Sequence, residues 1–123
     1  MKRNELEERL IEYSVSVIGL LHSLPDTKTS NHLSGQLLRS GTSAALNYGE
    51  AQSGESRKDF IHKIKVILKE LRESLICLKI MHRSNQFSDE VKMLKLIKET
   101  NELVAIFTKS AQTAERNQIS VKT

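Results

Sequence analysis

Residues 56–83, SRKDFIHKIKVILKELRESLICLKIMHR, carry the most regular apolar pattern in this sequence. Apolar side chains recur there at intervals of three and four residues, which is typical of an α-helix with one buried side. They are Ile61, Ile64, Leu68, Leu71, Leu75 and Leu78, with Phe60 and Ile67 beside them. The Ser56 hydroxyl can cap the first turn, and Asp59 stands three residues later, as in a variant of the capping box. The stretch therefore predicts a helix that begins after Ser56 and ends near residues 83–85.

The same period continues towards the N-terminus. One predicted helix ends at Pro25, because proline does not continue a helix and a polar connection follows it. A second predicted helix begins at an N-cap formed by Ser30 or Asn31 and runs to about Ala51. Gly54 is the expected break between the second and third helices.

A fourth helix is expected to open at Ser88, where Asp89 and Glu90 place two acids at the positive end of the helix dipole. Its predicted inward residues are Val91, Leu94, Ile97, Asn101, Val104, Phe107 and Ala111. In the first helix they are Leu6, Leu10, Tyr13, Val17, Leu21 and Leu24, with Ile11 and Ile18 on the flank. Helices joined by short connections pack as antiparallel neighbours. The predicted fold is therefore all-α, an antiparallel up-down-up-down four-helix bundle.

The 123 residues are enough for one domain with one core. We expect a single domain over residues 1–116 and a disordered tail over residues 117–123, where the apolar pattern stops. The single cysteine, Cys77, excludes an intramolecular disulfide and a multi-cysteine metal site. The charged N-terminus is unlike a secretory signal, and no stretch approaches the ~18 apolar residues of a membrane span. A cytoplasmic protein without a membrane partner is expected.

Polar side chains form one row on the second predicted helix. Gln36, Ser40, Ser43 and Asn47 are spaced by four, three and four residues, with Glu50 beside them; these five residues are called the polar face. The row falls on the inward side of the helix. A buried polar group costs about 1–3 kcal/mol if it is unpaired, so hydrogen bonds within the bundle are expected. Two interpretations are open: a polar pocket in the core, or a role in close packing and register.

Positive charge concentrates on the third predicted helix. Residues 53–84 contain eight basic and four acidic residues, an excess equal to the net charge of +4 of the whole chain. Five of these bases are called the basic face: Lys58, Lys65, Lys69, Arg72 and Lys79. Such a face can neutralise phosphates and release their counterions. The alternative is a solvated flank that is partly offset by Glu70 and Glu73. No aromatic residue interleaves with these bases, so nucleic-acid contacts are expected to be with the backbone.

Sequence signatures of enzymes are missing. The four histidines form neither of the helical patterns that bind zinc or di-iron centres, and the sequence has no glycine-rich phosphate loop and no nucleophile elbow. Ser40, Ser43 and Cys77 have no evident base partner. We therefore expect no catalytic residue, no metal site and no cofactor.

The third predicted helix has more apolar surface than a solitary bundle needs. Val66, Ile76 and Ile80 lie off its main apolar row, and a helix that is apolar on most sides is usually buried on most sides. This pattern favours a homo-oligomer in which the extra residues pack on a neighbouring subunit. Scattered surface hydrophobes, which are normal, are the alternative.

Four stretches together resemble a known family. They are residues 36–43 (QLLRSGTS), 47–51 (NYGEA), 55–63 (ESRKDFIHK) and 68–73 (LKELRE). They resemble the four-helix-bundle proteins encoded in intervening sequences of bacterial large-subunit ribosomal RNA genes, over about residues 5–115. The matching positions resemble determinants of fold and interface more than a catalytic site: Arg39, Ser40, Ser43, Asn47, Glu50, Asp59, Phe60 and Glu70.

The resemblance implies a closed bundle that assembles as a homopentamer with a basic surface. A relative in the same family is the accessory protein of diversity-generating retroelements, which is thought to bind nucleic acid and a reverse transcriptase. RNA or DNA and a protein of that kind are therefore the partners that the resemblance implies.

These patterns predict a non-enzymatic oligomeric protein that binds the backbone of RNA or DNA through the basic face. The alternative is a protein-interaction scaffold without nucleic-acid binding, in which the charges only keep the helix soluble.

Overall fold

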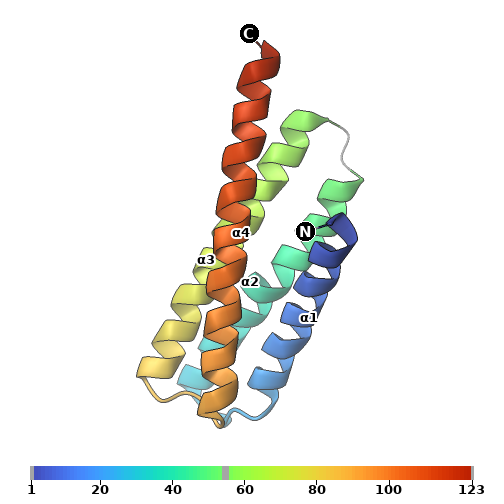
Figure 1. Ribbon diagram of the computed structural model, residues 1–123. Helices are drawn as coiled ribbons and strands as arrows, with labels where there is room; N and C mark the ends of the chain where they lie inside the picture. The colour runs from blue at the N-terminus through green and yellow to red at the C-terminus, as the bar shows by residue number, and fades with distance from the viewer. Residues whose placement is uncertain (1, 54–55, 123) are drawn as a thin grey trace.

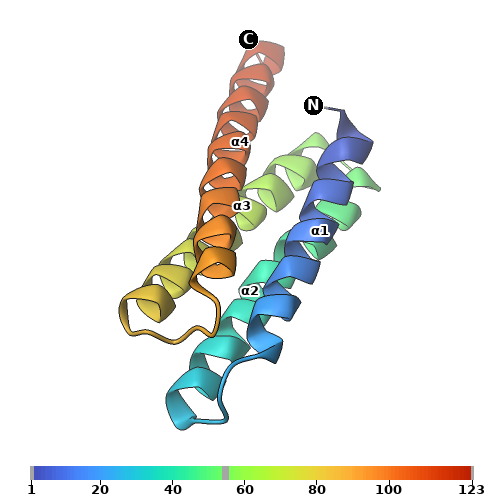
Figure 2. The same ribbon diagram turned by 60° about the horizontal axis from the view of Figure 1, so that its bottom comes forward.

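The computed structural model describes residues 2–53 and 56–122, with side chains as far as Asn117, and these residues form four α-helices (Figure 1). The helices are α1 (Arg3–His22), α2 (Lys28–Gln52), α3 (Arg57–Arg83) and α4 (Glu90–Lys122). Each helix packs on the next one in the chain, and a smaller interface between α1 and α4 completes the arrangement. The connections α1–α2 and α3–α4 lie together at one end of the bundle (Figure 2). The predicted all-α up-down bundle is confirmed.

The start of α2 differs from the prediction by one turn. Thr27 is the N-cap, and its Oγ1 accepts a hydrogen bond of 3.1 Å from the backbone N–H of Ser30. Ser30 and Asn31, the predicted caps, both lie inside the helix. The Ser30 side chain is buried and donates to Gln86 Oε1 at 2.6 Å, so it joins α2 to the α3–α4 connection instead. Several hydroxyls in one connection can each cap a helix, and tertiary contacts select among them.

The other two predicted caps have different outcomes. Ser56 caps α3 as predicted, because its Oγ accepts from the backbone N–H of Asp59 at 3.1 Å. At the start of α4, Asp89 Oδ1 accepts from the backbone N–H of Lys92 at 3.2 Å, where Ser88 was expected to act. The Ser88 hydroxyl bonds Ser23 at 2.5 Å and so ties together the two connections at this end of the bundle.

The α3 helix ends at Arg83 as predicted, and Asn85 follows in the left-handed region with φ 59°. Asparagine tolerates this conformation better than most residues with a side chain. The backbone N–H of Gln86 then donates to the Met81 carbonyl at 2.8 Å, which satisfies one of the last carbonyls of the helix.

The inward side of α4 was predicted with the wrong rotation in the first half of the helix; further along, Phe107 and Ala111 are buried as predicted, and Ile97 and Val104 are partly buried. Val91 and Leu94 are 62% and 47% exposed, and Asn101 is exposed as well. The residues that α4 buries are Met93, Leu96, Thr100, Leu103, Phe107 and Ala111. The first half of α4 has two adjacent apolar rows, and both fit the helical period. The buried row is the one in which the Thr100 hydroxyl meets the hydroxyl of buried Tyr13, at 2.8 Å. In α1, by the same kind of shift, Leu20 is buried and Leu21 only partly so.

The α1 and α2 helices approach each other closely at Gly41. A Cβ at this position would stand 3.0 Å from Cγ2 of Val17, a fully buried β-branched side chain with little rotamer freedom. The Ser14 hydroxyl reaches the Gly41 carbonyl at 3.5 Å across the same contact. Glycine at this position therefore sets the distance between the two helices.

The α4 helix projects beyond the other three at the end where both termini lie (Figure 1). Its backbone is helical to Lys122, past the domain boundary expected at residue 116. Among the residues whose side chains are described, the last buried one is Ala111. A tail formed by residues 117–123 stays a prediction, and Gly54, the expected break, lies outside the described residues. None of the described helices is long and apolar enough to cross a membrane.

Candidate nucleic-acid interface

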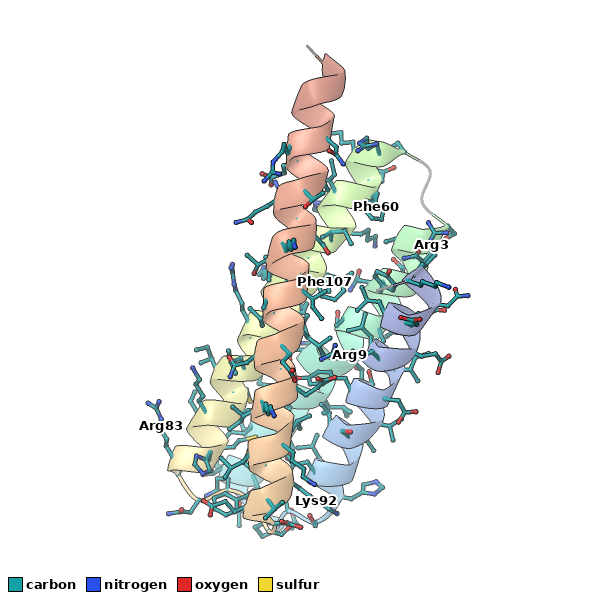
Figure 3. The ribbon with its side chains drawn as sticks, in the orientation of Figure 1. Arg3, Arg9, Phe60, Arg83, Lys92 and Phe107 are labelled. Carbon is teal, nitrogen blue, oxygen red and sulfur yellow. The ribbon has the colours of Figure 1, made fainter. Side chains whose placement is uncertain are left out.

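The basic face lies on the outer side of α3, turned away from the core. Lys58, Lys65, Lys69 and Arg72 are exposed, and Lys79 is partly exposed. Lys58 and Lys79 are 21 residues apart, so the basic face extends for ~30 Å along the helix. Arg83 continues it at the far end of α3, where its side chain points into solvent (Figure 3). The structure therefore places the five predicted residues on one accessible surface.

Two of the three acids of α3, Glu70 and Glu73, do not offset this surface, because they face α2. Arg39 on α2 donates to Glu70 Oε2 at 3.0 Å and also forms an ion pair with Glu73. The hydrogen bond that Glu70 accepts and the negative charge of Glu70 raise the pKa of Arg39. On the same side of α3, Lys63 forms an ion pair with Glu50 of α2. Between α2 and α3, two cations thus pair with three carboxylates, while Lys58, Lys69, Arg72 and Lys79 remain on the outer side of α3.

One member of the basic face is engaged within the chain. Lys65 forms an ion pair with Glu115 of α4, and both side chains are about half exposed. Within residues 2–53 and 56–117, no acidic side chain forms an ion pair with Lys58, Lys69, Arg72 or Lys79. These four cations are therefore available to an anionic partner.

The polar face belongs to the contact between α2 and α3. The Ser40 hydroxyl is fully buried and bonds the Ser74 hydroxyl at 2.8 Å, while Ser74 also donates to the Glu70 carbonyl at 3.0 Å. These hydroxyls satisfy each other, as buried polar groups must.

The rest of the polar face is partly or fully exposed. Asn47 Nδ2 donates to the Ser43 hydroxyl at 2.9 Å, and Lys63 approaches Asn47 Oδ1 at 3.4 Å. Gln36 was predicted to lie on the inward side of the helix, but it is exposed, and Glu50 is exposed as well. None of the five residues lines either of the two grooves found among the described residues. The geometry supports the packing and register interpretation over a pocket.

Exposed apolar residues form a larger set than the sequence suggested. On α3, Ile76 and Ile80 are 56% and 50% exposed, while Val66 is partly buried. Sequence reasoning missed most of a second set, on the outer sides of α1 and α2: Ile11, Val15, Ile18, Leu38 and Leu46. Their i, i+3 and i+4 spacing on α1 was visible in the sequence, but the isolated pattern does not distinguish a surface row from the flank of a buried one.

Cys77 and Tyr13, two side chains with ionisable groups, are buried in the core, where they pack against other residues. Cys77 is buried, and burial raises the pKa of its thiol, which disfavours the reactive thiolate. Burial also raises the pKa of Tyr13 to about 12, although its hydrogen bond with Thr100 acts in the other direction. Among the described residues, no group of three or more His, Cys, Asp or Glu side chains is arranged to hold a metal ion.

Comparisons with known proteins agree with this architecture. The model of the family described as "23S rRNA-intervening sequence protein" matches residues 2–109. A crystal structure from Bacteroides thetaiotaomicron, of a protein of unknown function from the S23 ribosomal protein family, is 28% identical in sequence. It superposes with a TM-score of 0.81, covering 91% of this chain and 99% of that one. No curated protein matches the chain.

Proposed function

Because the chain belongs to the family of 23S rRNA-intervening sequence proteins, we propose that it is a non-enzymatic, oligomeric protein of the cytoplasm that binds the backbone of RNA or DNA through the basic face. The observation that carries this proposal is the outer side of α3. It presents a ~30 Å row of cations, and Glu70 and Glu73 of the same helix pair with Arg39 of α2.

A row of this kind suits phosphates rather than bases. Lys and Arg side chains on a convex helix reach the backbone of a nucleic acid, where contacts fix position without reading sequence. Each phosphate that is neutralised releases condensed counterions, which supplies a favourable entropy. Lys58, Lys69, Arg72 and Lys79 are the residues proposed to make these contacts, and Lys65 joins them if its ion pair with Glu115 opens.

The salt dependence of binding tests this mechanism. We expect the affinity for a nucleic acid to fall steeply between 50 and 200 mM salt, with a log–log slope of about −3 to −4 for four phosphate contacts. Fluorescence anisotropy with a labelled oligonucleotide of mixed sequence measures the slope. A slope near zero, or no binding at low salt, would contradict the proposal.

We also propose that the protein assembles with copies of itself, as the family resemblance implies with its homopentamer. A closed ring needs two different patches on each copy. The set on α1 and α2 (Ile11, Val15, Ile18, Leu38 and Leu46) and the pair Ile76–Ile80 on α3 supply two such patches. Ile76 lies between Arg72 and Lys79 on the outer side of α3, so a contact at Ile76 and Ile80 leaves Lys58, Lys65 and Lys69 clear and brings Arg72 and Lys79 to its rim.

Molar mass in solution checks the assembly. We expect light scattering at micromolar concentration to give a multiple of the 14.0 kDa chain mass, with five copies as the predicted multiple. A mass of 14.0 kDa throughout the peak would contradict self-association.

The second candidate function is a protein-interaction scaffold. The same exposed apolar residues support it, because patches of this kind often bind a partner protein. A reverse transcriptase, named by the resemblance, stays a prediction as such a partner. The scaffold differs from the main proposal in one respect that can be measured: it requires apolar contacts and no salt-dependent binding of nucleic acid.

A further inference from the structure

A second basic surface lies at the end of the bundle from which α4 projects. A groove of about 770 Å³ runs there between the first turns of α3 and the C-terminal half of α4. Its lining includes the Phe60 ring and Ile106, both partly exposed, and its charged residues are Arg57 and Lys109. Among the described residues that line it, none is acidic. Figure 3 shows Phe60 at this end of α3, beside the projecting part of α4.

The groove combines four features that suit an anionic, aromatic ligand. Its volume lies within the ~300–1,000 Å³ of small-molecule sites. The partly exposed Phe60 ring offers a flat apolar surface, and the two cations give the groove a positive charge. The side chains of Ser110, Thr113 and Asn117 add hydrogen-bonding groups, and no hydrogen bond to another described residue occupies them.

The groove and the basic face meet at the first turn of α3. Arg57 lines the groove, and its neighbour Lys58 is the first residue of the basic face. A strand whose phosphates follow the basic face therefore reaches the mouth of the groove without a gap in positive charge. Aromatic side chains beside such cations bind the unpaired bases of single strands by stacking, with little preference for sequence.

We propose that this groove takes an unpaired nucleobase of single-stranded RNA or DNA, stacked on Phe60, with the flanking phosphates held by Arg57 and Lys109. The inference rests on the proposed nucleic-acid binding and deepens it, because it makes the single strand the preferred ligand. It also assigns an aromatic residue to the basic surface, where the sequence pattern predicted none. Phe60 lies one helical turn after Arg57, and α4 adds Lys109 across the groove.

The test compares a single strand with its duplex, using the full-length protein and fluorescence anisotropy at one salt concentration. The wild-type protein is expected to bind the single strand more tightly. Phe60→Leu keeps an apolar side chain and removes the ring, so it should weaken single-strand binding about tenfold. Duplex binding should change by less than about twofold, because backbone contacts remain. Phe87→Leu, a change in the ring that stacks on His82 at the other end of the bundle, is the matched control and should alter neither affinity.

Photocrosslinking gives a second readout that does not depend on a variant. A single strand carrying 5-iodouracil is expected to crosslink to the tryptic peptide of residues 59–63, which contains Phe60. Crosslinks confined to the outer side of α3 would overturn the groove assignment.

The outcomes separate the two proposals. If the wild-type protein binds the single strand and the duplex equally well, only the proposal of a nucleobase site in the groove is overturned. The same holds if Phe60→Leu lowers the affinity for both ligands equally. A peptide of Glu and Leu serves as an acidic competitor. If it displaces the single strand and binds the Phe60→Leu variant more weakly, the groove binds protein segments, and the assignment to a nucleobase is overturned. If the protein binds neither the single strand nor the duplex, the nucleobase site and the proposed function are both overturned.

Discussion

Reversing four charges on the outer side of α3 is expected to abolish nucleic-acid binding. The variant Lys58→Glu, Lys69→Glu, Arg72→Glu, Lys79→Glu changes the four cations of the basic face that have no ion pair in the described part of the chain, and it takes the net charge from +4 to −4. We expect the affinity at low salt to fall at least about 100-fold, because each lost phosphate contact also forfeits counterion release. Anisotropy titrations of the variant and the wild type measure the change.

A variant of equal charge on other helices is the matched control. Lys28, Lys92, Lys95 and Lys98 are exposed residues of α2 and α4, and changing all four to Glu alters the net charge by the same amount. This control is expected to lose much less affinity than the α3 variant. Equal losses would show that net charge alone matters and would contradict a binding surface on α3. Unchanged thermal unfolding of both variants shows that the fold is intact.

The second large effect is on stability, in α4. Leu103 is fully buried, so Leu103→Ala leaves a cavity and is expected to lower the free energy of unfolding by about 2–5 kcal/mol. Leu94 is 47% exposed, so Leu94→Ala makes the same chemical change on the same helix and should cost less than about 1 kcal/mol. Urea denaturation followed by circular dichroism measures both.

This pair decides how α4 is rotated. The sequence pattern placed Leu94 inward, while the structure buries Leu103 and the rest of its row. A large loss for Leu94→Ala together with a small one for Leu103→Ala would reverse the assignment of the buried side.

The two helices α3 and α4 explain how far sequence reasoning reaches here. In α3 one apolar row dominates, so its buried side and both its ends could be predicted from spacing and from the Ser56 hydroxyl. In α4 two rows compete, and the choice depends on which one meets Tyr13 and the other helices. Local pattern does not contain that information.

In the candidate site, too, some features could be predicted from the sequence and others depend on how the helices pack. The basic face could be predicted, because residues at helical spacing share a side whatever surrounds them. The net charge of the basic face could not be predicted, because it depends on the ion pairs of Glu70 and Glu73 with Arg39 of α2. Phe60 was assigned to the widened apolar row of its helix, and only the packing of α4 shows that its ring lines a groove.

The order in which the helices pack has a consequence for how the chain folds. The three larger interfaces join helices that are consecutive in the sequence, and only the small α1–α4 interface joins the ends. Most contacts therefore close short loops, and chains of this kind cross a low entropic barrier and fold in microseconds to milliseconds. The hydrogen bonds Arg9–Glu99 and Tyr13–Thr100 span some 90 residues and have the largest loops to close. Of the two helices that the α1–α4 interface joins, α1 also has the smaller interface with its neighbour in the chain, so α1 is the helix expected to join the bundle last and to leave it first.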